Sequence, residues 1–336
     1  MTNIREVITN EDDLSRRYVL RDGFVFSALT SPANVYDAIL IKVPNDIRSF
    51  YGSQFPTSRT LEEHIDFINK YKIEKATIIA DNIEFITKCP TLKYLSIIPG
   101  DSVGDGFDYS PLYEMPEIKC LSCETKYGFK EKFKTTVDCA RIKGLEDLNA
   151  INQYYLNFNT VKTLKDLTLT AYKKEDLSEA FVSPVLDSLY VFQSKLKSLD
   201  GIETSSKMQC LYLYHNRSLQ DISALKKVKN TLTALHIENC PKITDFSVLG
   251  ELENVELLRL FGKNELPNLS FLKSMKKLKT FVFDMNVIDG DLSPCLELSY
   301  AHNETNKKHY NLKDKDLPKG EYFRGNESID EWRRFY

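Results

Sequence analysis

The sequence lacks the features that would place the protein in a membrane or on nucleic acid. No apolar run in its 336 residues approaches the roughly 18 residues that a transmembrane helix needs. Residues 1–7 carry no basic stretch leading into an apolar one, which argues against a secretory signal. The net charge is −3, so no global positive field favours nucleic acid or anionic lipid. We therefore expect a cytoplasmic protein with neither nucleic-acid nor membrane partners.

Paired cysteines and metal-binding motifs are also missing. The seven cysteines are an odd number and are widely spaced, which is typical of free thiols in a reducing compartment. Cys120 and Cys123 form a lone CxxC, without a second pair or a histidine cluster at zinc spacing. The five histidines match no metal-ligand motif. We therefore expect no metal site and no cofactor.

Motifs of catalysis are absent as well. The sequence has no G-x-S-x-G, no Walker-type phosphate loop and no G-x-G-x-x-G. His236 and Glu238 lie two residues apart and could form a general base, but no nucleophile accompanies them. An enzyme with a repeat-containing recognition domain is thus a less favoured interpretation, and its active site would have to lie in residues 1–72 or 301–336.

What the sequence does contain is an internal repeat. Five phrases follow the pattern apolar-x-x-apolar-x-apolar, and their first positions are 22, 24, 23 and 23 residues apart. The phrases are Leu186/Leu189/Val191, Met208/Leu211/Leu213, Leu232/Leu235/Ile237, Val255/Leu258/Leu260 and Leu278/Phe281/Phe283. A fixed period in this range predicts a solenoid, in which each coil contacts only its neighbours.

The phrases resemble bacterial leucine-rich repeats of the short, internalin-like type. The ninth position of that pattern is Asn or Cys, and Asn216, Cys240 and Asn286 match it here, whereas Ser194 and Lys263 depart from it. The resemblance implies an α/β solenoid: a curved array with a parallel β-sheet on the concave face and short 3-10, loop or helical segments on the convex face. It also implies a bacterial protein that recognises another protein.

A second stretch repeats after each phrase. Asp221-Ile-Ser223, Asp245-Phe-Ser247 and Asn268-Leu-Ser270 occupy equivalent positions. Asp, Asn and Ser hydrogen-bond nearby backbone groups and so favour turns and caps. We expect these residues to begin the convex segments.

The array is predicted to span residues 73–300, with a capping region on each side. Weaker copies of the phrase include Ile73/Ala76/Ile78, Leu92/Leu95/Ile97, Met115/Ile118/Cys120 and Leu164/Leu167/Leu169. The array is regular from about residue 160 and irregular over residues 133–160, where Ile142 to Leu148 resembles a convex stretch. Residues 1–72 should form an N-terminal cap of strands and a helix that begins with the capping box of Thr60 and Glu63. Residues 301–336 should form a C-terminal cap with a short terminal helix.

The residues between the apolar positions indicate a candidate binding face. The third, fifth and seventh phrase positions project from the sheet on the side opposite the core, because side chains alternate along a strand. Aromatic and charged residues gather there, as in protein-binding hot spots. The candidate partner-binding residues are Tyr190, Phe192, Tyr212, Tyr214, His236, Glu238, Leu257, Arg259, Phe261 and Asp284. Stacking of neighbouring aromatics that only stabilises the sheet is the competing interpretation.

We therefore expect a non-catalytic, monomeric protein-binding module that uses its concave face. An immunity protein that neutralises a bacterial toxin domain is the leading role, because a large rigid face suits tight inhibition. An adaptor or scaffold, or an effector directed at a host cell, is the alternative.

Overall fold

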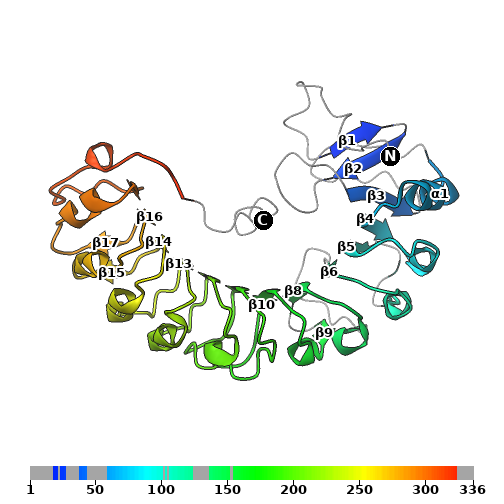
Figure 1. The fold of residues 1–336 in the computed structure, drawn as a ribbon, viewed down its shortest axis with the longest axis horizontal. Helices are drawn as coiled ribbons and strands as arrows, with labels where there is room; N and C mark the ends of the chain where they lie inside the picture. Colours follow the sequence, from blue (N-terminus) through cyan, green and yellow to red (C-terminus); the bar gives the residue numbers. More distant parts are fainter. Residues whose placement is uncertain are drawn as a thin grey trace. The chain divides into compact units, whose positions relative to one another are not determined.

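The computed structural model of the protein (Figure 1) describes residues 18–21, 23–27, 38–43, 59–100, 103, 106–123, 136–151 and 154–323. These residues fall into two compact units. The first extends to Asn149 and includes residues 154–156. The second comprises residues 150–151 and 157–323. The predicted terminal helix, with Trp332, lies outside the described residues.

The first unit is a sheet whose strands follow one another in chain order, apart from one short strand pair. Its strands are β1 (Tyr18–Arg21), β2 (Phe24–Ser27), β3 (Ala38–Val43), β4 (Lys75–Ala80), β5 (Tyr94–Pro99), β6 (Cys120–Cys123) and β8 (Asp147–Ile151). β1, β2 and β3 pair antiparallel, and β3 to β8 pair parallel. Helix α1 (Leu61–Tyr71) and the 3-10 segments η3 (Glu84–Lys88), η4 (Ser110–Tyr113) and η5 (Cys139–Arg141) connect them. β7 (Val137–Asp138) and β9 (Tyr155–Leu156) form a separate pair.

The predicted capping box of the N-terminal helix is confirmed. The Thr60 hydroxyl accepts the backbone N–H of Glu63 at 3.2 Å, and the Glu63 carboxylate accepts the backbone N–H of Thr60 at 2.7 Å. Two backbone donors that a helix N-terminus leaves unpaired are thereby satisfied.

Two register predictions in the first unit are wrong. Leu121 pairs with Leu95 and is fully buried, so the phrase of this coil is Ile118/Leu121/Cys123 rather than Met115/Ile118/Cys120. The stretch from Ile142 to Leu148 is not convex over its whole length, because β8 already begins at Asp147. In both places two overlapping sets of apolar residues fit the repeat pattern, and core packing selects the other one.

The second unit is a regular stack of parallel coils. Its strands are β10 (Asp166–Thr170), β11 (Ser188–Phe192), β12 (Cys210–Tyr214), β13 (Ala234–Glu238), β14 (Leu257–Phe261), β16 (Thr280–Phe283) and β18 (Tyr300–Asn303), and each pairs with the next. The 3-10 segments are η6 (Phe158–Thr160), η7 (Ile202–Thr204), η8 (Ser223–Val228), η9 (Ser247–Glu251), η10 (Ser270–Lys273), η11 (Ser293–Glu297) and η12 (Asp314–Asp316). β15 (Glu265–Leu266) pairs with β17 (Asn286–Val287). Within this unit the strands line one side of the coils, and η7 to η11 line the other (Figure 1).

Leucines at equivalent positions form the core of the second unit. The register aligns one buried residue of each coil with the next in an unbroken row, which consists of Leu167, Leu189, Leu211, Leu235, Leu258 and Phe281. Burying one such side chain contributes roughly 1.5–3 kcal/mol. The row therefore fixes the register of every strand in the unit.

Polar side chains inside the coils form hydrogen bonds with backbone groups that have no partner in the β-sheet. Asn216 accepts the N–H of Ser194 at 2.9 Å and donates to the carbonyl of Val191 at 2.8 Å. Asn264, rather than Lys263, takes this role in its coil and donates to the carbonyls of Cys240 and Ile243 at 3.0 and 2.8 Å. Unpaired buried backbone groups would be costly, so these amides link each coil to its neighbour.

The predicted role of Asp and Asn at the start of the convex segments is confirmed. The side-chain oxygens of Asp221, Asp245, Asn268 and Asp291 each accept the backbone N–H two residues later, at 2.8 or 2.9 Å. Hydrogen bonds from the backbone lower the pKa of Asp221 and Asp245, because they favour the charged carboxylate.

The seven cysteines are all buried and free of disulfides. Burial raises the pKa of Cys89 to about 11, so this thiol stays protonated and acts as a packing group. Within the described ranges, no group of three or more His, Cys, Asp and Glu side chains could hold a metal ion. The described part of the chain also contains no helix long and apolar enough to cross a membrane.

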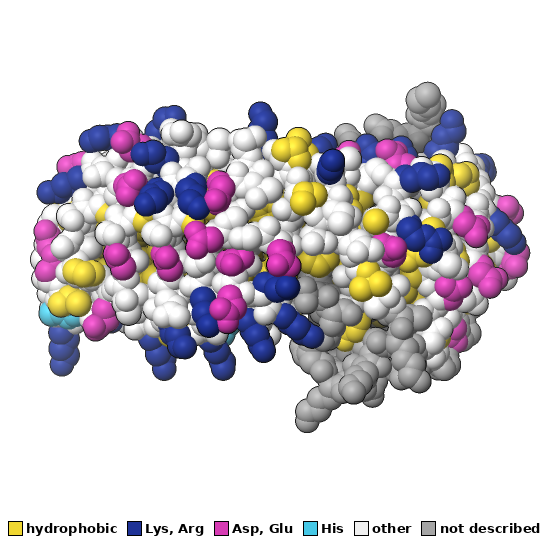
Figure 2. Space-filling model, turned by 90° about the horizontal axis from the view of Figure 1, so that it is seen from below, with side chains coloured by type: hydrophobic (Ala, Val, Ile, Leu, Met, Phe, Trp, Pro, Cys, Tyr) yellow, Lys and Arg dark blue, Asp and Glu magenta, His cyan; other side chains and the backbone are white. Residues whose placement is uncertain are grey.

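One face of the molecule shows basic and acidic side chains interspersed, with hydrophobic side chains in small separate patches (Figure 2). No field of a single sign covers this face, in keeping with the net charge of −3.

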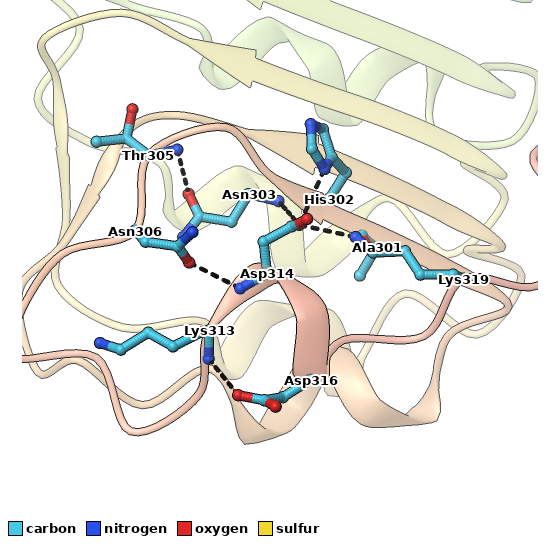
Figure 3. Close-up of polar contacts among 9 residues, drawn as sticks. All are labelled: Ala301, His302, Asn303, Thr305, Asn306, Lys313, Asp314, Asp316 and Lys319. Carbon is cyan, nitrogen blue, oxygen red and sulfur yellow. Dashed lines mark hydrogen bonds and ion pairs between the residues drawn. The ribbon is translucent and has the colours of Figure 1, made fainter.

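The Asp314 carboxylate organises the end of the second unit (Figure 3). Its Oδ1 accepts the N–H of Asn303 at 2.8 Å, contacts Nδ1 of His302 at 2.9 Å and pairs with Nζ of Lys319 at 2.7 Å. Lys319 also donates to the carbonyl of Ala301 at 2.7 Å. These contacts hold the chain after η12 against β18.

Asp314→Asn is expected to loosen this end in a pH-dependent way. Burial acts to raise the pKa of Asp314, but hydrogen bonds from Lys319 and Asn303 outweigh it and lower the pKa below the ordinary 3.8. A carboxylate with a lowered folded pKa stabilises the fold above its ordinary pKa and stops doing so as the pH falls through the folded value. Thermal unfolding should therefore show a lower midpoint for the variant at neutral pH and none of this difference in strongly acidic solution. Glu304→Gln, an exposed carboxylate on the same coil, is the control and should leave the midpoint unchanged at both pH values.

Candidate protein-binding face

The ten candidate residues lie on one face of the second unit, in rows that the strand register builds. The first row consists of Tyr190, Tyr212, His236 and Arg259, and it ends at Val282. The second row consists of Phe192, Tyr214, Glu238 and Phe261. Leu257 begins β14, and Asp284 directly follows β16. We call this surface the sheet face.

Tyr212 lies at the centre of a connected group of rings. Its ring centroid is 5.4 Å from that of Phe192, 6.1 Å from that of Tyr214 and 4.1 Å from that of His236. Tyr190 makes an edge-to-face contact with it at 6.4 Å. Edge-to-face and tilted pairs at these distances add roughly 0.5–1.5 kcal/mol each beyond area burial. The aromatic block is therefore rigid as well as apolar.

Glu238 supplies the polar centre of the sheet face. Its Oε2 accepts the hydroxyl of Tyr212 at 3.1 Å and lies 3.1 Å from Nε2 of His236. The His236 ring is also 5.3 Å from that of Phe261. The hydrogen bond to this carboxylate thus holds the Tyr212 ring, and the His–Glu pair noted in the sequence lies within an aromatic surface.

The sheet face is more deeply buried than expected for a solvent-facing sheet. Tyr190, Tyr212, His236 and Leu257 project from the side opposite the leucine row, yet each has an exposed fraction of 7% or less. The other six candidates are half-buried. Part of the reason is that the rings pack over small residues of the same face, since Tyr190, Tyr212 and Leu257 form one apolar cluster with Cys210 and Ala234.

Residues 322 and 323, which were not predicted to reach the sheet face, also bury part of it. Phe323 packs against this apolar cluster, and its N–H donates to the hydroxyl of Thr280 at 2.9 Å. The Arg259 guanidinium donates to the hydroxyl of Tyr322 and lies 5.5 Å from the centroid of its ring. Tyr322 and Phe323 belong to a polar stretch without hydrophobic periodicity, so no sequence pattern indicated that they reach this face.

Asp284 lies on the sheet face and also connects two neighbouring coils through a hydrogen bond. Its Oδ1 accepts the N–H of Gly262 at 2.6 Å, which joins the ends of two adjacent strands. Gly262 has φ +130, a conformation that side chains strongly disfavour. The equivalent residues Gln193, His215 and Asn239 are left-handed, with φ near +50. After β11, β12, β13 and β14 the chain therefore turns away from the sheet at the same position, directly after the aromatic rows.

Two carboxyls lie beside the aromatic block at the start of β10 and β11. Burial and the nearby charge of Asp187 raise the pKa of Asp166 to about 6. Burial raises the pKa of Asp187 as well, although its Oδ1 accepts the Ser188 hydroxyl at 2.7 Å. The charge of Lys165 acts in the opposite direction on both carboxyls and lowers their pKa values, but burial prevails.

Comparisons with known proteins establish the class of fold. No protein-family model and no curated protein matches the sequence, whereas 52 chains of solved structures match the fold. One is an internalin, InlF, from Listeria monocytogenes, with a TM-score of 0.52 and 15% identity over 77% of this chain and 76% of that chain. The protein therefore has the fold of a leucine-rich repeat solenoid, as the repeat pattern predicted.

Two further likenesses are weaker. A leucine-rich repeat protein of Leptospira interrogans matches with a TM-score of 0.38 and 13% identity, over 74% of this chain and 82% of that one. The plant peptide hormone receptor RGFR1, solved in complex with RGF2, matches with a TM-score of 0.29 and 14% identity, over 67% and 50%.

Tyr212→Phe should destabilise the second unit, and Tyr214→Phe should not. The first change removes only the hydroxyl that donates to Glu238, a hydrogen bond worth on the order of 1 kcal/mol. The Tyr214 hydroxyl makes no hydrogen bond to any described residue, so its loss is the matched control. Chemical denaturation followed by circular dichroism measures both free energies of unfolding. Equal losses in the two variants would contradict the role given to the Tyr212–Glu238 hydrogen bond.

Proposed function

We propose that the protein is a non-catalytic binding module that grips a protein partner on the sheet face of its second unit. The observation that carries this proposal is the connected block of rings ordered around Glu238. A parallel sheet needs no such block for its own stability, since the leucine row on the opposite side already supplies a core. Aromatic side chains with charged neighbours are typical of the residues that dominate binding energy in protein interfaces.

The half-buried residues are the parts of the face that a partner would touch. Phe192, Tyr214 and Phe261 present ring area with few rotatable bonds, which limits the entropy lost on binding. Arg259 and Glu238 stand between them and offer charges of both signs. The buried rings beneath give this surface a firm support. The partner would place apolar side chains on the rings.

For the biological role, we propose a cytoplasmic, monomeric immunity protein that occludes a bacterial toxin domain. A rigid face with preformed aromatic anchors favours slow dissociation, which an inhibitor of a toxin needs. An adaptor or a host-directed effector is the second candidate, because the same face could join two proteins without inhibiting either.

Partner capture should depend on the half-buried rings. Tyr214→Ala combined with Phe261→Ala removes two anchors, each worth roughly 2 kcal/mol in a hot spot, and should raise the dissociation constant by on the order of 1,000-fold. Ile288→Ala with Leu296→Ala is the control, since it removes similar apolar area at exposed positions away from the face. The partner is captured with the wild-type chain, and its affinity for each variant is then measured by calorimetry. Unchanged binding by the Tyr214/Phe261 variant would rule out the sheet face.

The immunity role has a separate test. Co-expression of the chain with the product of a toxin-like neighbouring gene should restore growth, and the Tyr214/Phe261 variant should fail to restore it. Binding to a partner whose activity is unaffected would instead favour the adaptor role.

A further inference from the structure

The chain after η12 turns back and runs onto the sheet face. Lys319 pairs with Tyr300 in an antiparallel bridge, and the N–H of Gly320 donates to the carbonyl of Ser299 at 3.0 Å. The pairing of Lys319 with Asp314 fixes this turn (Figure 3). The direction of the chain at residue 320 is therefore set by several contacts at once, and it points across the strands.

Tyr322 and Phe323 then seat on the face itself. Besides the Arg259 contact, the Tyr322 ring meets that of Tyr300 edge-to-face at 5.0 Å. The ammonium of Lys279 lies 4.5 Å from the centroid of the Phe323 ring. Cation–π contacts of this kind contribute roughly 0.5–2 kcal/mol each. The two consecutive aromatic residues thus contact three neighbouring strands. Tyr322 contacts Arg259 in β14 and Tyr300 in β18, and Phe323 contacts Lys279 and Thr280 at the start of β16.

A row of mostly small residues next to Phe323 is as deeply buried as the core of the unit. Ser188, Cys210, Ala234, Leu257 and Thr280 begin successive strands, project on the sheet face and have exposed fractions of 4% or less. The larger side chains of the first row flank this row along the strands. Phe323 occupies the end of this row at Thr280.

The chain that follows Phe323 has the length and composition to continue along this row. Residues 324–336 number 13. They would extend about 20 Å as a helix and up to about 43 Å extended. From β16 to β11 are four strand spacings, or about 19 Å. Ile329, Trp332 and Phe335 recur at helical spacing in the sequence and would give the segment one apolar side.

We propose that residues 321–336 are an intramolecular ligand of the sheet face, and that a partner must displace them to bind. Displacement by a partner rests on the proposed function. Binding of residues 321–336 to the sheet face does not depend on it. Tyr322 and Phe323 anchor the segment, and the apolar side of the remaining residues covers the row of small residues. The apparent affinity for a partner is then lowered by the fraction of molecules whose face is occupied.

Trp332 is the only tryptophan of the chain, so its fluorescence in the full-length protein reports on this segment. In the wild type we expect weak quenching by acrylamide and emission at shorter wavelength than that of free tryptophan. Tyr322→Ala with Phe323→Ala should increase the quenching several-fold, as should Phe192→Ala with Tyr214→Ala on the distant strands β11 and β12. Ile288→Ala with Leu296→Ala should change nothing. Tyr322→Phe, which removes only the hydroxyl bonded to Arg259, is too mild to prevent folding and should give a smaller increase.

Three results would overturn the proposal. Trp332 could be fully quenchable in the wild type, which would mean that nothing shields it. It could be shielded but indifferent to the Phe192/Tyr214 changes, which would place it on another surface such as the last coil. Shielding that grows with protein concentration, together with a dimer in sedimentation, would assign the segment to a second copy.

The captured partner separates this inference from the proposed function. Tyr322→Ala with Phe323→Ala should bind the partner several-fold more tightly than the wild type does, in contrast to the weakening expected from Tyr214→Ala with Phe261→Ala. If Trp332 behaves as expected but no change on the sheet face alters partner binding, the proposed binding face fails and the intramolecular ligand stands.

Discussion

The unshifted pairing of each coil with the next is the constraint on which the second unit depends. It holds because the row from Leu167 to Phe281 must stay buried, and a slip of one residue would turn every such side chain to the other face. Asn216 and Asn264 reinforce it, since their amides pair backbone groups of the neighbouring coil. The residue with positive φ that follows each of the strands β10 to β14 then begins the turn at the same height in each of these coils.

The rows of the sheet face are a consequence of this pairing. Once the leucines are in register, the residues between them must also form rows, and Tyr212 meets Tyr190 and His236 without any further adjustment. Residue types at these positions can vary without changing the register, because the leucines on the opposite side of the sheet set it. This separation explains how a repeat with a nearly fixed inner side can present an aromatic block with Glu238 at its centre.

Prediction from the sequence was accurate where the repeat pattern is unambiguous. The strands from β10 to β16, the Asx residues that begin the 3-10 segments and the capping box at Thr60 followed from local patterns with one solution. The errors at Leu121 and Asp147 arose where two overlapping frames satisfy the same pattern, and only packing against β5 and β6 distinguishes them. The rows of the candidate face were predictable for the same reason as the strands. Their burial was not, because it depends on residues distant in the chain.

The sequence by itself determined the period, the inner row and the side of the sheet from which each side chain projects. These properties follow from alternation along a strand and from the cost of exposing leucines. Only the tertiary structure decided what lies over the outer side. Tyr322 and Phe323 reach Arg259 and Thr280 across separations of 63 and 43 residues, through a turn that Asp314 and Lys319 hold in place. No local pattern encodes such a contact, since it arises from the direction in which one coil ends and from the rings that the neighbouring coils present.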